Sequence, residues 1–306
     1  MLDSFIVAGR ASGWSDATAR QYRKHLEYWQ DFLAGSEPTP QNLKEWIVSL
    51  RAKWAPATVR SAVIAVRGYL RYIGRDDLAG TIKPPQPPPR VQRTISAAEV
   101  ARLLTAAETH VVTGVSPRAA EAASARNAAI VAVLYDCWLR ASELCSLTLD
   151  AVSVDARRLI VAGKGDREEL VAYSAETALR LLAWMNLRGT VANRNTRALF
   201  VSVGGNTPGA AITPQGLRAI LNSLGRRAGV DNVTPHSFRR GGATQAIRLG
   251  ASTRYVQAHG RWAKLEMVER YTRALDPGDL IERYSPVSNM TRKRAPVPSL
   301  PWTDGR

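Results

Sequence analysis

The chain has 306 residues, of which 45% are hydrophobic; this is enough for a buried core in each of two domains and too apolar for a disordered protein. Lysine and arginine total 42 against 26 acidic residues, a net charge of +16, so the sequence predicts a polyanionic partner, with nucleic acid as the first candidate. No apolar run approaches the roughly 18 residues of a membrane-spanning helix, so we expect no membrane partner.

The N-terminus and the cysteines both favour an intracellular protein. The first residues, Met1 to Phe5, lack the basic start and the long apolar stretch of a secretion signal. A cytoplasmic, nucleoid-associated protein is therefore expected. Cys137 and Cys145 are eight residues apart with no Cys-x-x-Cys pair, so we expect buried free thiols rather than a zinc site or a disulfide framework.

Three helices are predicted near the N-terminus, at 16–34, 41–53 and 56–73, because apolar residues recur there at helical spacing. We expect them to form a small helical DNA-binding bundle over residues 1–82. Basic residues on their outer faces are candidates for contacts with a DNA backbone, although such a face is as often simply solvated. These candidates are Arg20, Arg23, Lys24, Arg51, Lys53, Arg60, Arg67 and Arg71.

A proline-rich stretch from Lys83 to Arg90 cannot continue a helix and favours an extended spacer. It predicts a linker over 83–94, followed by a second domain over 95–285. The remaining residues, 286–306, are predicted to form a basic, flexible tail.

The second domain is predicted to begin with a capping box, in which Ser96 and Glu99 open a helix. The alanine-rich residues 107–123 look loop-prone. Arg140 falls at a junction between two helices. The other predicted helices and one strand-like run are 124–138, 175–188, 199–201 (the strand-like run) and 214–228.

Two short β-prone runs, 159–162 and 170–173, indicate a hairpin in this domain. The glycine-flanked tip between them carries Lys164. Its Gly-Lys-Gly sequence is also an ordinary turn and lacks the Ser or Thr and the following helix of a phosphate-binding Walker loop. The predicted fold is therefore mainly α with a small β-sheet, an α+β class.

The stretch from Thr234 to Tyr271 concentrates the chemistry. Thr234 and Pro235 are predicted as the N-cap and the first residue of a helix. His236 and Arg239 then lie on one face of its first turns and form a cradle for an anion, to which the helix N-terminus adds N–H groups. Trp262 and Tyr271 are expected on later helices. The indole can donate a hydrogen bond and the phenol can act as a nucleophile.

Together these residues resemble the catalytic set of the tyrosine recombinases, the phage integrase family. Leu-Arg-Ala-Ser-Glu-Leu looks like the family's first arginine box, Gly-Lys-Gly resembles its hairpin lysine, and His-Ser-Phe-Arg matches its His-x-x-Arg box. The resemblance covers about residues 96–284, and residues 1–80 are similar, more weakly, to the family's SAM-like core-binding domain. The residues that it places in the site are Arg140, Lys164, His236, Arg239, Trp262 and Tyr271.

Trp262 stands nine residues before Tyr271, where most members have histidine and Cre-like members have tryptophan. His259 stands twelve residues before Tyr271 and is out of register. The sequence also departs from the family. Arg240, which we count among the candidate DNA contacts, replaces a second histidine, and Arg261 replaces a small residue.

A third departure is Glu169, which lies where a basic residue often closes the hairpin. None of the departures removes a reacting group, so the resemblance still implies activity. Glu143, three residues after Arg140, is interpreted either as a buried partner that orients this arginine or as a helix-cap acid.

The implied reaction is attack of a phenolate on a DNA phosphodiester. Arginine forks suit the charge that develops on the non-bridging oxygens, a role for Arg140 and Arg239. His236 is the candidate base for Tyr271, whose ordinary pKa is about 10. The resemblance makes Lys164 the general acid for the leaving 5′ oxygen. A 3′-phosphotyrosyl bond keeps the phosphodiester energy, so neither ATP, nor another cofactor, nor a metal is expected.

The resemblance also implies partners: double-stranded DNA with specific recombination sites, and a homo-tetramer on two duplexes built from free monomers or dimers, with residues 272–306 docking on a neighbour. Two other functions stay open. One is a type IB topoisomerase-like enzyme that nicks and rejoins a single duplex. The other is a non-catalytic, sequence-specific DNA-binding protein of the same fold.

Overall fold

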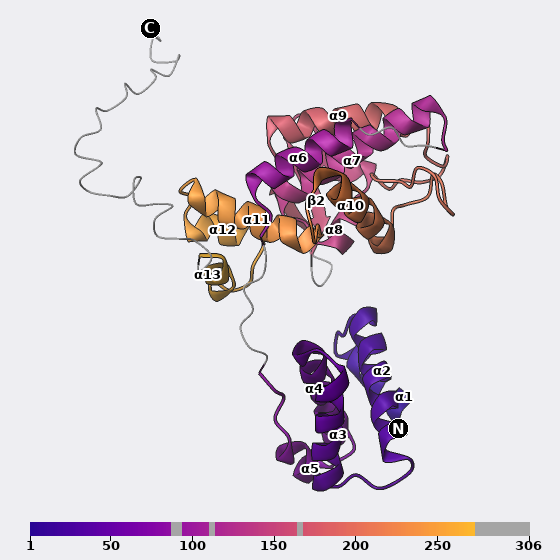
Figure 1. Cartoon of the computed structure of the whole chain (residues 1–306), viewed down its shortest axis with the longest axis vertical. Helices are drawn as coiled ribbons and strands as arrows, with labels where there is room; N and C mark the ends of the chain where they lie inside the picture. Colours follow the sequence, from indigo (N-terminus) through magenta and orange to yellow (C-terminus); the bar gives the residue numbers. More distant parts are fainter. Residues whose placement is uncertain (87–93, 110–113, 164–167, 273–306) are drawn as a thin grey trace, which may run out of the picture. The chain divides into compact units, whose positions relative to one another are not determined.

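The structure is a computed structural model that describes residues 1–86, 94–109, 114–163 and 168–272. The chain divides into two compact units, Met1–Arg90 and Val91–Arg306, which are described separately (Figure 1). The domain and linker boundaries stay predictions. The short helix at 279–284 and the tail, also predicted, lie outside the described residues.

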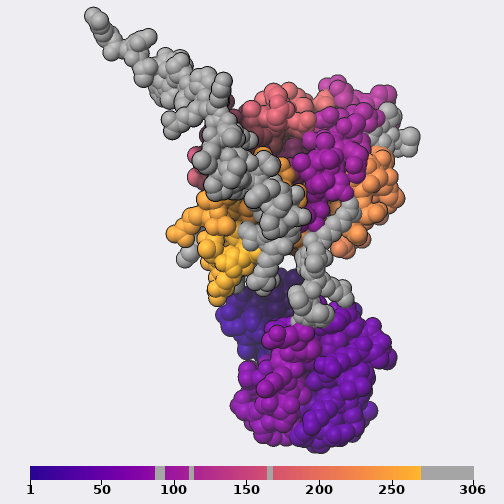
Figure 2. Space-filling view, turned by 60° about the vertical axis from the view of Figure 1, so that its left-hand side comes forward, coloured from indigo at the N-terminus to yellow at the C-terminus, as the bar shows by residue number. Residues whose placement is uncertain are grey.

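The N-terminal unit is a bundle of helices (Figure 1), whose atoms form one compact body in the space-filling view (Figure 2). Its residues form α1 (Leu2–Ala11), α2 (Asp16–Leu33), α3 (Pro40–Lys53), α4 (Pro56–Tyr72) and α5 (Asp76–Thr81). The three predicted helices are present within one residue of their expected ends. α1 and α5 were not predicted; α5 has only six residues, and neither helix has a side-chain N-cap hydrogen bond.

Large aromatic side chains fill the centre of this bundle. Trp29 of α2 and Trp46 of α3 are fully buried, with ring centroids 5.0 Å apart in an edge-to-face arrangement. Ser15 and Thr39 cap α2 and α3 through side-chain oxygens that accept backbone N–H groups. The predicted apolar stripes are therefore the faces that form the core.

The second unit is mainly helical and contains, in its described residues, an antiparallel sheet of order β1-β2-β3. The predicted hairpin is the β2–β3 pair, with its second strand starting two residues earlier than expected, and β1 was not predicted. Its elements are α6 (Ala97–Glu108), α7 (Pro117–Cys137), α8 (Ala141–Ser146), the 3-10 turn η1 (Leu149–Ala151), β1 (Val152–Ser153), β2 (Arg158–Ala162), β3 (Glu168–Ala172), α9 (Ala175–Arg188), α10 (Pro214–Ala228), α11 (Pro235–Arg248), α12 (Thr253–His259) and α13 (Glu266–Thr272). Figure 1 shows α6, α7 and α9 alongside one another.

Three predictions for this unit were wrong in detail. α7 begins at Pro117 and not near residue 124, because Ser116 caps it, proline suits its first position, and alanine favours the helix over the expected loop. The run 199–201 is not a strand; Val201 forms an isolated bridge with Ala211, and Ala198, just before the run, forms one with Thr148. Trp262 lies in the turn between α12 and α13 rather than on a helix.

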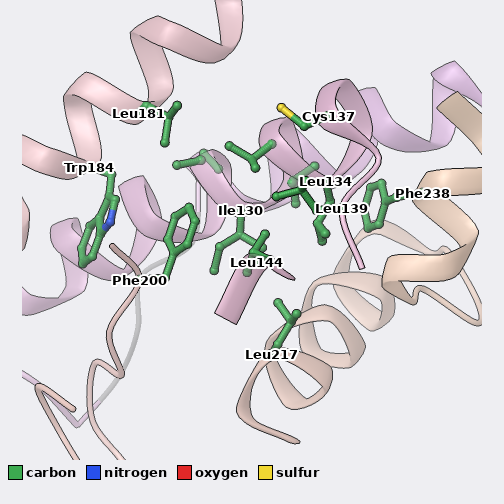
Figure 3. Close-up of a cluster of buried hydrophobic side chains, with 14 of the residues drawn as sticks. Ile130, Leu134, Cys137, Leu139, Leu144, Leu181, Trp184, Phe200, Leu217 and Phe238 are labelled. Carbon is green, nitrogen blue, oxygen red and sulfur yellow. The ribbon is translucent and has the colours of Figure 1, made fainter. Parts of the chain in front are cut away.

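One buried cluster extends from α7 to α11. Figure 3 shows Ile130 and Trp184 at one part of it and Leu139 and Phe238 at another. Leu139 directly precedes Arg140, and Phe238 directly precedes Arg239. The same hydrophobic core therefore holds the backbone of both candidate phosphate-binding arginines.

A smaller cluster joins the last helices to the end of α7. It consists of Trp138, Ala243, Ile247, Val256, Trp262 and Val268. Gly242 allows the close approach of α11, because a Cβ atom there would lie 2.1 Å from Nε1 of Trp138. In the described part of the chain, no helix combines the length and apolar character needed to cross a membrane.

Candidate active site

Arg140 stands at the N-cap of α8, the helix junction that the sequence indicates. Its side chain is 45% exposed, whereas that of Glu143 is 6% exposed. Glu143 accepts a hydrogen bond from the backbone N–H of Arg140 at 2.8 Å and forms an ion pair with its guanidinium. Both interpretations of Glu143 therefore describe real contacts, since it caps the helix and holds the arginine side chain.

The pKa of Glu143 lies below its ordinary value. Burial alone would raise this pKa, but the backbone N–H of Arg140 and the charges of Arg261 and Arg140 together outweigh the burial. The carboxylate is thus a permanent anion at neutral pH, fixed between two arginines.

Arg239 projects from α11 into the protein and is only 4% exposed. Its Nη1 donates to the carbonyl oxygen of Trp138 at 2.6 Å, and its Nη2 donates to that of Gly260. Its Cζ lies 4.5 Å from the ring centroid of Trp262, a cation–π contact. The guanidinium is consequently fixed by two backbone groups and one aromatic face.

The backbone of the turn before Trp262 allows the indole ring to pack against the guanidinium of Arg239. A Cβ atom at Gly260 would lie 1.9 Å from the Trp262 ring, so only glycine fits. Arg261 adopts a left-handed backbone conformation with φ of 54°. Trp262 is buried as a result, with its ring packed against the guanidinium.

His236 occupies the first turn of α11, between Thr234 and Ser237, the two residues of its capping box. Partial burial lowers the pKa of its imidazole, and the positive charges of Arg240, Arg239 and Arg140 lower it further, while one carboxylate opposes them. The ring is therefore neutral at pH 7 and can accept a proton.

His259, the out-of-register histidine, is engaged elsewhere. Its Nε2 lies 2.8 Å from the backbone oxygen of Asp136. The ring packs edge-on against Trp138 and stacks with Tyr255, with centroid distances of 4.4 and 5.5 Å. These contacts give it a packing environment, whereas Trp262 is the side chain that touches Arg239.

The structure describes the two remaining predicted residues less fully. Lys164 lies outside the described residues, between β2 and β3. Tyr271 lies in α13, which packs against α11 and α12. The assignment of both as reacting residues remains a prediction.

The sequence did not indicate that Arg261 and Glu169, two of the residues that depart from the family pattern, contact each other. The side chain of Arg261 is 6% exposed; its Nη2 lies 2.7 Å from Glu143 and its Nε lies 3.1 Å from Glu169. The two residues that depart from the family pattern are thus partners. No local sequence signal identifies them, because they are 92 positions apart (261 − 169).

The candidate DNA contacts of the N-terminal unit divide into three groups. Arg20 and Lys24 on α2 and Arg51 and Lys53 on α3 are exposed. Arg60 and Arg67 instead donate to the backbone oxygens of Pro85 and Ala79, at 3.1 and 3.0 Å. Ion pairs with acidic residues of the same unit occupy the other two, Arg23 with Asp3 and Arg71 with Asp76.

Relatives of the chain are tyrosine recombinases. XerD of Pseudomonas putida is 30% identical over 287 residues, covering 89% of this chain and 92% of that protein. XerC of Corynebacterium efficiens is 29% identical over 275 residues, covering 87% and 83%.

Solved structures show the same fold. XerH site-specific recombinase bound to difH substrate in a post-cleavage complex aligns with a TM-score of 0.68 and 18% identity, covering 88% of this chain and 79% of that one. A lambda integrase dimer bound to a COC′ core site aligns with 0.66 and 12%, covering 90% and 96%. These alignments confirm the predicted fold class.

Two family descriptions match the sequence itself. "Phage integrase, N-terminal SAM-like domain" matches residues 10–76, and "Phage integrase family" matches residues 93–277. These matches confirm the resemblance drawn from the arginine, lysine and His-x-x-Arg motifs. The chain belongs to the phage integrase family.

Proposed function

We propose that the chain is a site-specific DNA recombinase that cuts and rejoins DNA through a 3′-phosphotyrosyl bond on Tyr271. The observation that carries the proposal is that two arginines from distant stretches of the chain are held in place beside one histidine. Arg140 and Arg239, nearly one hundred residues apart in sequence, are fixed by Glu143 and by the backbone oxygens of Trp138 and Gly260, and the charges of both arginines lower the pKa of His236. The recombinase relatives support the same reaction.

Arg140 and Arg239 bind the scissile phosphate in this mechanism. The five-coordinate phosphorus of the transition state carries extra negative charge on its non-bridging oxygens, and planar guanidinium groups match those oxygens two at a time. The side chain of Arg140 is 45% exposed, so it can meet DNA. Arg239 is held by Trp138 and Gly260 before DNA arrives, which removes the reorganisation that a mobile arginine would need.

Tyr271 is the nucleophile and His236 is its base. The phenol proton passes to the neutral imidazole as the bond from Tyr271 Oη to phosphorus forms. The nearby guanidinium groups also lower the energy of the phenolate. Trp262 packs over Arg239 and donates one neutral hydrogen bond to the phosphate.

Lys164 supplies the proton for the leaving oxygen. As the bond between phosphorus and the 5′ oxygen breaks, that oxygen takes a proton from the lysine and departs as a hydroxyl. The phosphotyrosyl ester that remains conserves the energy of the broken bond. A 5′ hydroxyl from another strand then reverses the step, and neither ATP nor a metal ion is consumed.

The partner is double-stranded DNA that carries recombination sites, which agrees with the net charge of +16. Four copies act together on two duplexes, because strand exchange needs a nucleophile at each of four strands. A protein with this substrate works in the cytoplasm, on the nucleoid. Residues 1–82 and 95–285 both contact the duplex, joined by the linker at 83–94.

A groove in the second unit favours contact between copies. It has a volume of about 410 Å³, and its lining includes Tyr135, Leu249 and Tyr255. Leu249 and Tyr255 are 64% and 53% exposed, which suits an apolar protein segment more than DNA. We assign to it the C-terminal segment, residues 272–306, of a neighbouring copy.

The test uses DNA duplexes taken from the regions that flank the gene. Each duplex carries a nick near the candidate cleavage site, so that the short strand released by cleavage is lost and the covalent adduct cannot rejoin. Unmodified protein should form a DNA adduct that resists denaturant, and Tyr271→Phe should form none while still binding the duplex. Absence of an adduct on every flanking sequence contradicts the proposal.

A second assay separates recombination from topoisomerase activity. Two marked sites on one plasmid should exchange their flanks, with products scored by restriction digestion. Relaxation of a supercoiled plasmid without any exchange would favour the type IB topoisomerase function instead.

A further inference from the structure

Arg261 lies between two carboxylates that belong to different elements. Its Nη2 donates a 2.7 Å hydrogen bond to Oε2 of Glu143 on α8. Its Nε lies 3.1 Å from Oε2 of Glu169 on β3, as an ionic contact. The same guanidinium approaches the backbone oxygens of Cys137 and His259, at 3.4 and 3.3 Å. A single buried cation thus touches α8, β3, the end of α7 and the last residue of α12.

We propose that Arg261 is a positioning residue whose charge joins the base of the β2–β3 hairpin to the phosphate-binding arginine of α8. The connection runs from Arg140 through Glu143 and Arg261 to Glu169. The inference rests on the proposed function, because it concerns how that active site is held together.

The electrostatics favour such a role. Arg261 and Glu143 are both 6% exposed, and a buried charge is costly unless it is paired, so these two groups restrain each other. The more exposed Arg140 and Glu169 are attached to this buried pair through their own ionic contacts. The planar guanidinium has donors pointing in several fixed directions and can address two carboxylates at once, which the single ammonium of a lysine cannot do with the same geometry. Arg261 therefore restrains the separation between α8 and β3 through a hydrogen bond to Glu143 and an ionic contact, without hydrogen-bond geometry, to Glu169.

Glu169 is the member of this connection that bears on the hairpin. It pairs with Val161 of β2, one position from the last paired residues, Ala162 and Glu168. A contact that holds Glu169 in place therefore also restrains the point at which β2 ends and the point at which β3 begins. The hairpin supplies the proton for the leaving oxygen in the proposed mechanism, so loss of the Glu169 contact should impair proton delivery more than phosphate binding.

The variant Glu169→Gln isolates this contact. The Glu169 side chain is 43% exposed, and Arg261 keeps its bond to Glu143 when Glu169 is neutral, so folding should survive. Glu168→Gln is the matched control, because successive side chains of a strand point to opposite faces and Glu168 is exposed. Both variants are full-length, and their melting temperatures and DNA affinities are measured first.

The readout is single-turnover cleavage of two substrates at one site. One has the natural 5′ oxygen at the scissile bond and the other has sulfur in its place. With sulfur, the bond from Tyr271 Oη to phosphorus forms, the phosphorus–sulfur bond breaks, the phenol proton goes to His236, and the sulfur leaves as a thiolate. A thiol has a pKa of about 8.5, so this leaving group needs no proton.

For the natural substrate, we expect Glu169→Gln to be slower than the unmodified protein by about tenfold or more, since small displacements of a catalytic group cost rates of this order. For the sulfur substrate, the two proteins should agree within about twofold, and Glu168→Gln should match the unmodified protein on both.

Two results overturn the inference. One is an unchanged rate for Glu169→Gln on the natural substrate, and the other is an equal loss on both substrates. Failure of the proposed function looks different, because the unmodified protein then forms no adduct with either substrate and the inference is lost with it.

Discussion

The guanidinium of Arg239 donates a 2.6 Å hydrogen bond to the backbone oxygen of Trp138, across 101 residues of sequence. Trp138 ends α7 in a left-handed conformation with φ of 51°, which is uncommon for a bulky residue. Its carbonyl oxygen accepts from Arg239, and its side chain belongs to the same cluster as Trp262. The end of α7 therefore helps to hold the candidate phosphate site in place.

Arg239→Lys should separate cleavage from binding. The lysine keeps the positive charge but loses the fork that addresses a carbonyl oxygen and a phosphate together. Cleavage should fall by about 10²- to 10³-fold, while the affinity for the site changes little. Arg248→Lys, on the same helix, is the control. Adduct formation and gel-shift titration give the two quantities, and an equal loss of both would contradict the assigned role.

The pH dependence of cleavage should reveal His236. Burial and three arginines lower the pKa of this imidazole below its ordinary value, so the base is unprotonated at neutral pH. The rate should fall only as the pH drops through that lowered pKa, below about 6.5. Rates measured at DNA concentrations below saturation report the free protein. His236→Gln should remove this acid limb, and a limb that persists in the variant assigns the titration to another group.

Gly242→Ala should destabilise the second unit. The added Cβ would lie 2.1 Å from Nε1 of Trp138 and 2.8 Å from the backbone oxygen of Tyr135, so helix α11 must move. We expect a loss of about 1–3 kcal/mol in the free energy of unfolding. Gly189→Ala is the control, because its Cβ would meet nothing within 4 Å. Urea denaturation compares them, and equal stabilities would show that α11 adjusts without cost.

Much of the fold follows from local sequence signals. The predicted helices 175–188 and 214–228 match α9 and α10 because each is marked at its start, by Ser174 and Thr213, whose side chains accept from backbone N–H groups. The start of α7 was missed despite a similar signal, since its alanine-rich first turns lack the large apolar residues on which the helical period is read.

The contacts that fix the site could not be predicted in this way. The pairing of Arg261 with Glu169 depends on how the turn after α12 meets the sheet, and no spacing along the chain reports that distance. Arg67 likewise looked like an outward-facing charge, but it donates to the backbone oxygen of Ala79 within α5, a helix that the sequence did not predict. Long-range packing decides these roles.

Basic residues of the N-terminal unit should affect either DNA binding or stability, depending on the contacts that their side chains make. Arg20→Ala and Lys24→Ala remove exposed charges, so each should weaken DNA binding and reduce the slope of log affinity against log salt by about one. Arg67→Ala, which removes the bond to Ala79, should lower thermal stability instead. Fluorescence anisotropy at several salt concentrations measures the slopes. An unchanged slope in the first two variants would remove them from the DNA interface.

His25 should make the stability of the N-terminal unit depend on pH. The ring is 5% exposed, and within the described residues neither of its nitrogens has a hydrogen-bond partner. Burial, followed by the charge of Lys24, lowers its pKa. The unfolded chain therefore binds a proton more readily than the folded one, so folding stability rises with pH in this range.

The contribution of His25 is fully present above the unfolded pKa of about 6.5 and is lost as the pH falls through the lowered folded value. His25→Leu keeps an apolar side chain beside Trp54, whose ring centroid lies 5.6 Å away, and removes the titrating group. Hydrogen exchange in α2 should then show a smaller loss of protection between pH 7.5 and pH 5 in the variant. Equal losses in both proteins would mean that other groups govern the acid sensitivity of this unit, because the same helix would open without the imidazole.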